Sequence, residues 1–194
     1  MPTDWTVRAI TCAMAPVLLP LTLVEIASGL VLGSFEAALL RSPTLLVLVP
    51  VTIGTAGNLG SVLAARLSTA LHQGLVQPRV RLDDERLRGA VAAAIANGLL
   101  ASAFAATVAF LVLTGLGRTV APLWVLLAVA LLGGVLSGLA LTATVVAAVF
   151  AGFRRGYNPD TLVGPVVTTA GDVFGVAFLL LAVRAVLLVS GGGG

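Results

Sequence analysis

Five long apolar stretches constrain this sequence more than any other feature. Each is longer than the ~20 residues that a helix needs to cross a hydrocarbon core of ~30 Å. Proline and glycine lie at most of the breaks between the stretches, as is typical of helix ends. We therefore predict an all-α, polytopic membrane protein with five transmembrane helices, at about residues 9–33, 44–71, 89–114, 121–150 and 161–189.

The composition supports the same class. Of the 194 residues, 59% are hydrophobic and only 10% are charged, whereas globular chains have roughly 25% charged residues. The net charge of +3 does not indicate a nucleic-acid partner, because the arginines lie in short connections between the apolar stretches. The longest connection, Gln77 to Arg88, is too short to fold alone. We expect residues 1–194 to form a single transmembrane domain with membrane lipid around it and no soluble regulatory domain.

The arginines also predict an orientation. Five crossings place the two ends of the chain on opposite sides of the membrane. Three arginines belong to the far side, namely Arg41, Arg118 and Arg184. Seven belong to the side of the N-terminus, namely Arg8, Arg79, Arg81, Arg86, Arg88, Arg154 and Arg155. The positive-inside rule then puts the N-terminus in the cytoplasm and the C-terminus outside. We expect a multi-pass protein of the cell membrane, with a prokaryotic plasma membrane as its setting.

Asp172 is the ionisable residue with the deepest predicted position. It follows Asp160, near the start of the fifth stretch, by about twelve residues or ~18 Å of helix, which is close to the bilayer midplane. A charge at that depth costs roughly 2.5–3.5 kcal/mol on insertion scales, so it indicates function by default. Pro165, Thr168 and Thr169 precede it and can free or replace backbone carbonyls, which then point into a cavity. The alternative is an aspartate that bonds a neighbouring helix as part of the packing.

The second stretch carries an amide at a similar depth. Asn58 lies near its middle, and Gly54, Gly57 and Gly60 recur every three residues around it. Glycines at this spacing line one face of a helix, where another helix or an ion can approach the backbone. The alternative is a small-residue packing seam with an interhelical hydrogen bond from Asn58, and the spacing alone does not decide between the two.

Other polar residues fall within or near the predicted helices. Glu25 is deep enough to be costly and could serve a cation path or a proton relay, or pair with Arg66 or with a threonine. Glu36 lies near the outer end of the first stretch, at a pore mouth or on the surface. Three residues are expected to form hydrogen bonds between helices instead of binding an ion, namely Asn97, Thr142 and Thr144.

Carboxylate, amide and carbonyl oxygens are hard ligands that suit Mg²⁺ or Ca²⁺. The sequence has no His/Cys cluster for zinc, no Ser-His-Asp set, no phosphate-binding glycine loop and no HExxH motif, so we expect no enzyme. A membrane enzyme with Asp172 and Glu25 as its acid–base pair would lack a nucleophile. One deep aspartate cannot hold a dication alone, but two copies across a two-fold axis can, which favours a homodimer. Without a cation the two carboxylates would repel each other.

Four segments, in chain order, carry a resemblance to a known family. Residues 33–36 read Gly-Ser-Phe-Glu, and Pro50–Gly60 contains Gly-x-x-Gly-Asn-x-Gly. Arg154–Pro159 reads Arg-Arg-Gly-Tyr-Asn-Pro, and Gly164–Gly175 reads Gly-Pro-x-x-Thr-Thr-x-x-Asp-x-x-Gly. Together they resemble the transmembrane domain of MgtE-type magnesium transporters and of related eukaryotic solute carriers, over nearly the whole chain.

The resemblance implies a five-helix dimer with its pore between the protomers. Asp172 would bind the hydrated ion from both subunits, and Asn58 with the carbonyls near Gly57 and Thr168 would help to line the site. Two positions depart from the family pattern: Val62 replaces a common glutamine, and Asn158 replaces an aspartate, which weakens a cytoplasm-side ion site. With no catalytic or cofactor site expected, the candidate metal-site residues are Asp172, Asn58, Gly57, Thr168, Thr169 and Glu25.

We therefore expect a divalent cation channel or transporter, with Mg²⁺ as the transported ion. Two alternatives remain at this point: an exchanger coupled to Na⁺ or H⁺ through Glu25, and a non-transporting assembly subunit. A heterodimer with a paralogous half is a further option beside the homodimer.

Overall fold

The computed structural model describes residues 6–35, 43–79, 83–156 and 159–191, with the side chains of 43, 159–162 and 191 left aside. Across these residues it is all-helical. Five helices are long and apolar enough to cross a membrane, which confirms the predicted fold class. They are α1 (Val7–Gly33), α3 (Pro43–His72), α4 (Glu85–Gly115), α5 (Leu123–Arg154) and α6 (Pro159–Gly191).

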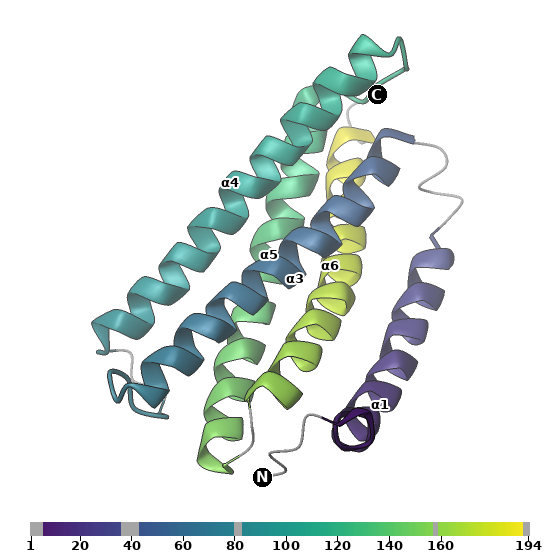
Figure 1. Cartoon of the computed structure of the whole chain (residues 1–194). Coiled ribbons are helices and arrows are strands. Elements are labelled where there is room, and N and C mark those ends of the chain that lie inside the picture. The colour runs from purple at the N-terminus through teal and green to yellow at the C-terminus, as the bar shows by residue number, and fades with distance from the viewer. Residues whose placement is uncertain (1–5, 36–42, 80–82, 157–158, 192–194) are drawn as a thin grey trace.

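Helices α3, α4, α5 and α6 form a bundle, and α1 lies outside it (Figure 1). Within the bundle α5 packs against the other three helices, and α3 packs against α4 and α6. Helix α1 rests on α6, and none of its residues is buried. Arg184 of α6 lies over the Phe35 ring at 4.3 Å and ties α6 to the end of α1 by a cation–π contact.

Local chemistry explains where the helices begin and end. The Asp84 carboxylate accepts hydrogen bonds from the Arg86 and Leu87 amides at 3.0 and 3.2 Å, so it caps α4 as acidic residues at helix N-termini do. Thr6 caps α1 in the same way, through the Ala9 amide. Three helices are followed by a glycine with a φ of 68°, a conformation that L side chains rarely adopt, namely Gly74, Gly117 and Gly156.

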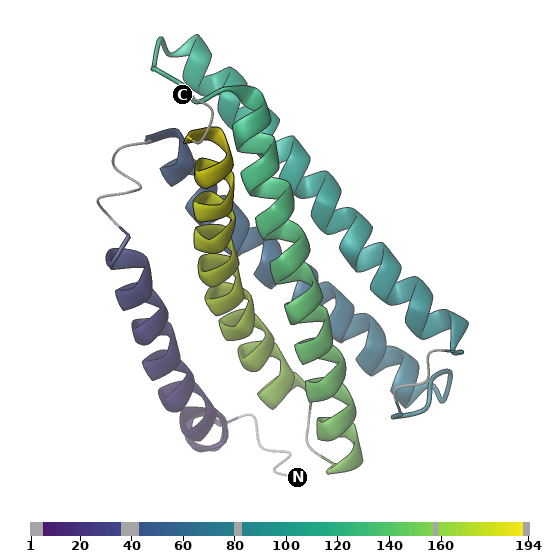
Figure 2. The ribbon, with the colours of Figure 1, turned by 180° about the vertical axis from the view of Figure 1, so that it is seen from behind.

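Helix α1 is bent near its start. Its first turns run in a different direction from the rest of the helix in both views of the ribbon (Figures 1 and 2). Pro16 and Pro20 lie inside the helix, and each lacks the amide that would bond to the carbonyl four residues earlier. The proline pair is therefore the physical cause of the bend.

Two buried apolar clusters are stacked along the bundle. One includes Leu45, Leu126 and Leu179, and the other includes Leu67 and Phe150. Between the clusters, all four bundle helices contribute small or hydroxyl-bearing residues, among them Gly57, Ser102, Ser137 and Gly171. Both polar regions described below lie in this middle layer.

Candidate ion-binding face

The closest approach of α3 and α6 occurs in the middle layer. A Cβ atom on Gly171 would lie 2.8 Å from both the Cα and the amide nitrogen of Gly57. One turn further along α6, a Cβ atom on Gly175 would lie 3.1 Å from the Ile53 Cα. The two helices are antiparallel and meet backbone to backbone at Gly57 and Gly171. Asn58 and Asp172, which follow these glycines directly, are therefore at the same level on neighbouring helices.

Asp172 lies on the side of α6 between the directions of α3 and α1. Successive residues of a helix advance by about 100°. Gly171 and Gly175 face α3, Thr169 faces α1, and Asp172 lies between these two directions. In Figure 1 α6 runs between α3 and α1. Asp172 is half-buried, and Thr168, one turn earlier on the same side of α6, is exposed.

Asn58 lies on the open side of α3. Gly57 is buried against α6, whereas Asn58 and Gly54 are exposed, and a Cβ atom on Gly54 would meet nothing within 4 Å. The packing-seam interpretation therefore holds for part of this motif, and an ion-binding role for Asn58 stays a prediction. Gly57 and Gly60 form a helix-packing seam, and Asn58 and Gly54 remain open to a partner or an ion.

Glu25 joins α1 to this face. The Thr169 hydroxyl donates a hydrogen bond of 2.7 Å to a Glu25 carboxylate oxygen. Of the partners that the sequence left open for Glu25, the structure selects a threonine. Thr169 lies three residues before Asp172, so this hydrogen bond holds the Glu25 carboxylate near the side of α6 that carries Asp172. Two acidic groups from α1 and α6 therefore share one environment.

Two candidate groups already have hydrogen-bond partners. The Thr168 hydroxyl donates to the Gly164 and Pro165 carbonyls, both at 3.0 Å, so its lone pairs remain available as acceptors. The Gly57 carbonyl accepts a hydrogen bond of 2.9 Å from the Ser61 hydroxyl. Gly57 is consequently the least suited of the candidates to bind an ion directly. Ser61 was not singled out in the sequence, although its position one turn after Gly57 was a signal for this bond.

The exposed groups of this face are mainly hydrogen-bond acceptors. Asp172 and Glu25 offer carboxylate oxygens, Asn58 an amide oxygen and Thr168 a hydroxyl oxygen. A hydrated dication presents water hydrogens, which acceptors of this kind bind. Among the described residues, no three His, Cys, Asp or Glu side chains gather in a group that could hold a metal ion. The arrangement suits a cation that keeps much of its water.

The polar residues of α4 and α5 that were expected to form hydrogen bonds between helices lie away from this face. Thr144 donates to the Ala140 carbonyl of its own helix at 3.0 Å, so the predicted interhelical bond is wrong, because the hydroxyl satisfies itself one turn back. Asn97 is exposed, and Thr142 lines a small cavity elsewhere in the bundle. Glu36 and Asn158 lie outside the described residues.

A protein-family model matches most of the chain. The family model MgtE, described as a divalent cation transporter, matches residues 49–182, which is more than half of the chain. The chain belongs to the MgtE family of divalent cation transporters. The matched range contains Asn58 and Asp172, whereas Glu25 precedes it. The place of Glu25 in the site therefore rests on its contacts with α6.

A curated relative extends the match toward eukaryotic carriers. The chain is 30% identical over 183 residues to solute carrier family 41 member 3 of the rat. That alignment covers 90% of this chain and 38% of the relative, so the chain spans well under half the length of this relative. The family is one of cation transporters, which agrees with five helices long and apolar enough to cross a membrane.

Proposed function

We propose that this MgtE-family protein conducts Mg²⁺ across the membrane as a homodimer, with one ion site formed by both protomers. The observation that carries the proposal is the position of the half-buried Asp172 near the middle of α6, on the side between the directions of α3 and α1. A carboxylate at this depth needs a compensating charge. A dication shared between two copies of Asp172 supplies it.

Size and charge support a hydrated ion. Mg²⁺ loses its water reluctantly and is usually bound through one or two carboxylates. Asp172 from each protomer would accept hydrogen bonds from the ion's water, with Asn58 and Thr168 beside it. Glu25, held by Thr169, would add negative charge next to the site. The Gly57 carbonyl would contribute only to the polar lining, because Ser61 already donates to it.

The surface around this face is suited to a partner protomer. Helix α1 buries none of its residues and exposes Leu19, Leu23 and Leu30 by 68%, 69% and 73%. Lipid can cover these apolar side chains, but it cannot stabilise the carboxylates beside them. A second copy related by a two-fold axis would enclose the acidic groups around a central pore. We place the N-terminus in the cytoplasm, following the arginine distribution.

The test is divalent cation uptake into proteoliposomes that contain the purified chain, with wild type beside Asp172→Asn. A membrane potential of ~100 mV contributes about 4.6 kcal/mol to the entry of a dication, so we expect uptake without a coupling ion. Wild type should take up Mg²⁺ and the variant should not. Arg118→Gln, in the exposed connection after α4, is the matched control and should transport like wild type.

Three further results would change the proposal. Equal uptake by wild type and Asp172→Asn would remove Asp172 from the ion path. Uptake that follows an imposed Na⁺ or pH gradient would replace the channel by a coupled exchanger. No uptake by a folded wild-type dimer would point to a heterodimer with a paralogous half or to a non-transporting subunit.

A further inference from the structure

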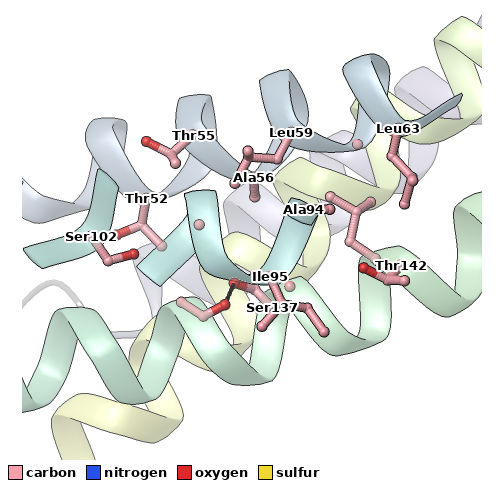
Figure 3. A pocket seen from close by; sticks show the side chains of 15 residues that line it. Thr52, Thr55, Ala56, Leu59, Leu63, Ala94, Ile95, Ser102, Ser137 and Thr142 are labelled. Atoms are coloured by element: carbon pink, nitrogen blue, oxygen red, sulfur yellow. Dashed lines mark hydrogen bonds between the residues drawn. The ribbon is translucent and has the colours of Figure 1, made fainter. Parts of the chain in front are cut away.

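A small cavity, lined by apolar surface and several hydroxyls, lies between α3, α4 and α5 (Figure 3). Asn58 of α3 is not among the residues that line it. The volume of the cavity is about 30 Å³. Its lining combines glycine and apolar side chains with the hydroxyl-bearing residues Thr52, Thr55, Ser102, Ser137 and Thr142. In Figure 3 Thr52 and Ser102 lie toward one end of the cavity and Thr142 toward the other.

Glycines explain both the tight packing and the remaining space. A Cβ atom on Gly98 would lie 3.1 Å from the Leu59 Cδ1, and one on Gly134 would collide with the Ser102 side chain. The three helices are therefore close together at these levels. A Cβ atom on Gly138 would meet nothing within 4 Å, so space is left one turn away from Gly134.

The hydroxyls of the lining are only partly satisfied by protein. Ser137 donates to the Gly133 carbonyl at 2.7 Å and keeps its lone pairs free as acceptors. Within the described part of the chain, Thr52, Ser102 and Thr142 form no hydrogen bond through their hydroxyls. The same part of the chain contains no buried side-chain oxygen or nitrogen without a partner. These three hydroxyl oxygens are therefore accessible to a molecule of the size of water.

We propose that this cavity binds ordered water, one or two molecules that bridge α3, α4 and α5 within the membrane. A water molecule needs a cavity volume of roughly 10–15 Å³ and two to four hydrogen-bond partners, and the cavity offers both. The site goes beyond the proposed transport function, because it lies away from the Asp172 face.

The lining argues against other occupants. It contains no charged side chain, so a bare cation would lose its water without gaining a counter-charge. The backbone carbonyls around the cavity already accept hydrogen bonds within their own helices, so each has at most one lone pair left for an ion. The space is too small for a lipid chain or an organic molecule. Water is the small neutral molecule that can both donate to Ser137 and accept from Thr52 and Ser102.

The test is a double-mutant cycle on thermal unfolding, using Thr52→Val and Ser102→Ala. Each change removes a hydroxyl and keeps most of the side-chain shape. If water bridges the two, each single variant should lower the Tm by about 2–4 °C. The double variant should lose less than the sum, because either change already removes the bridge. Thr107→Val on α4 is the matched control and should change the Tm less, since its hydroxyl bonds within its own helix at 2.8 Å.

If the cavity is dry, the change in Tm should be zero or positive. In that case Thr52→Val and Ser102→Ala remove unsatisfied hydroxyls, and the Tm stays unchanged or rises. Additive losses would show that no water is shared between the two residues. If the variants fail to fold, radiolytic hydroxyl labelling of wild type decides. Bound water should produce local labelling of Leu59 and Ile95, and its absence would overturn the proposal.

Discussion

The two polar regions of the bundle lie in the same middle layer, but they differ in charge and in exposure. The Asp172 face contains two carboxylates, of which Glu25 is exposed and Asp172 half-buried. The polar side chains that line the cavity between α3, α4 and α5 are all uncharged and carry hydroxyls. Within a membrane, uncharged hydroxyls can be satisfied by their own helix or by water, whereas carboxylates need a cation or a partner.

This difference predicts effects of opposite sign. On the Asp172 face, removing charge should lower transport and stabilise the ion-free protein, because functional sites often retain unfavourable interactions. In the cavity, removing hydroxyls should lower stability and leave transport nearly unchanged.

Asp172→Asn should separate transport from stability most clearly. We expect Mg²⁺ uptake to fall by about 100-fold, the equivalent of one charge-assisted interaction of roughly 2.7 kcal/mol. In Mg²⁺-free buffer the variant should have a higher Tm than wild type, because a neutral amide replaces a costly carboxylate that lies on the same side of α6 as Glu25. Thermal unfolding with and without Mg²⁺ measures both effects. A lower Tm without Mg²⁺ would show that the Asp172 charge stabilises the fold. The Asp172 face and the cavity would then not differ in the way proposed.

Gly171→Ala should destabilise the protein by about 1–3 kcal/mol. Its Cβ would lie 2.8 Å from the Gly57 backbone, which cannot move aside as a flexible side chain can. Helices α3 and α6 would separate, and Asn58 and Asp172 would move apart. Gly54→Ala on the exposed side of α3 is the matched control, because its Cβ meets nothing within 4 Å. The control should keep or slightly raise the Tm, since alanine favours helix. Equal Tm values for the two variants would contradict the close helix contact.

Glu25→Gln should have an intermediate effect on transport. The glutamine amide oxygen can still accept the hydrogen bond from Thr169, so the variant removes charge and keeps the contact. We expect the Mg²⁺ concentration for half-maximal uptake to rise by about 10-fold, as one weaker electrostatic contribution implies. Thr169→Val removes the hydrogen bond and keeps the charge, and its effect should be smaller, about threefold. A larger effect for Thr169→Val would mean that the position of Glu25 matters more than its charge.

Much of the fold could be predicted because each helix is longer than the membrane is thick. Hydropathy alone placed five spans, and the observed ends of α1 and α6 differ from the expected ones by only a few residues. Asp172 and Asn58 were recognisable for a related reason: a polar group in the middle of an apolar run is costly and therefore noticeable.

Contacts between helices could not be predicted in the same way. From the sequence, the partner of Glu25 could be Arg66 or a threonine, because hydropathy does not show which helices are neighbours. It also assigned Thr144 to a neighbouring helix, whereas its hydroxyl bonds to Ala140 one turn back. The cavity was missed altogether. Two features of the sequence indicate it: Gly98 and Ser102 lie one turn apart on α4, and small residues surround Ser137 on α5. These features form a cavity only because the two helices pack against each other, which the sequence does not show.

Gly138→Ala should give the smallest effect and test the cavity most directly. Its methyl group would enter open space in the cavity lining, so no neighbour has to move. Alanine adds up to about 1 kcal/mol of helix propensity, and filling a dry apolar space would add to that gain. In a hydrated cavity the methyl group displaces water that satisfies hydroxyls, which offsets the gain. We therefore expect a Tm within about 2 °C of wild type and unchanged Mg²⁺ uptake. A clearly higher Tm would indicate a dry cavity, and reduced uptake would show that the cavity and the Asp172 face are coupled through α3.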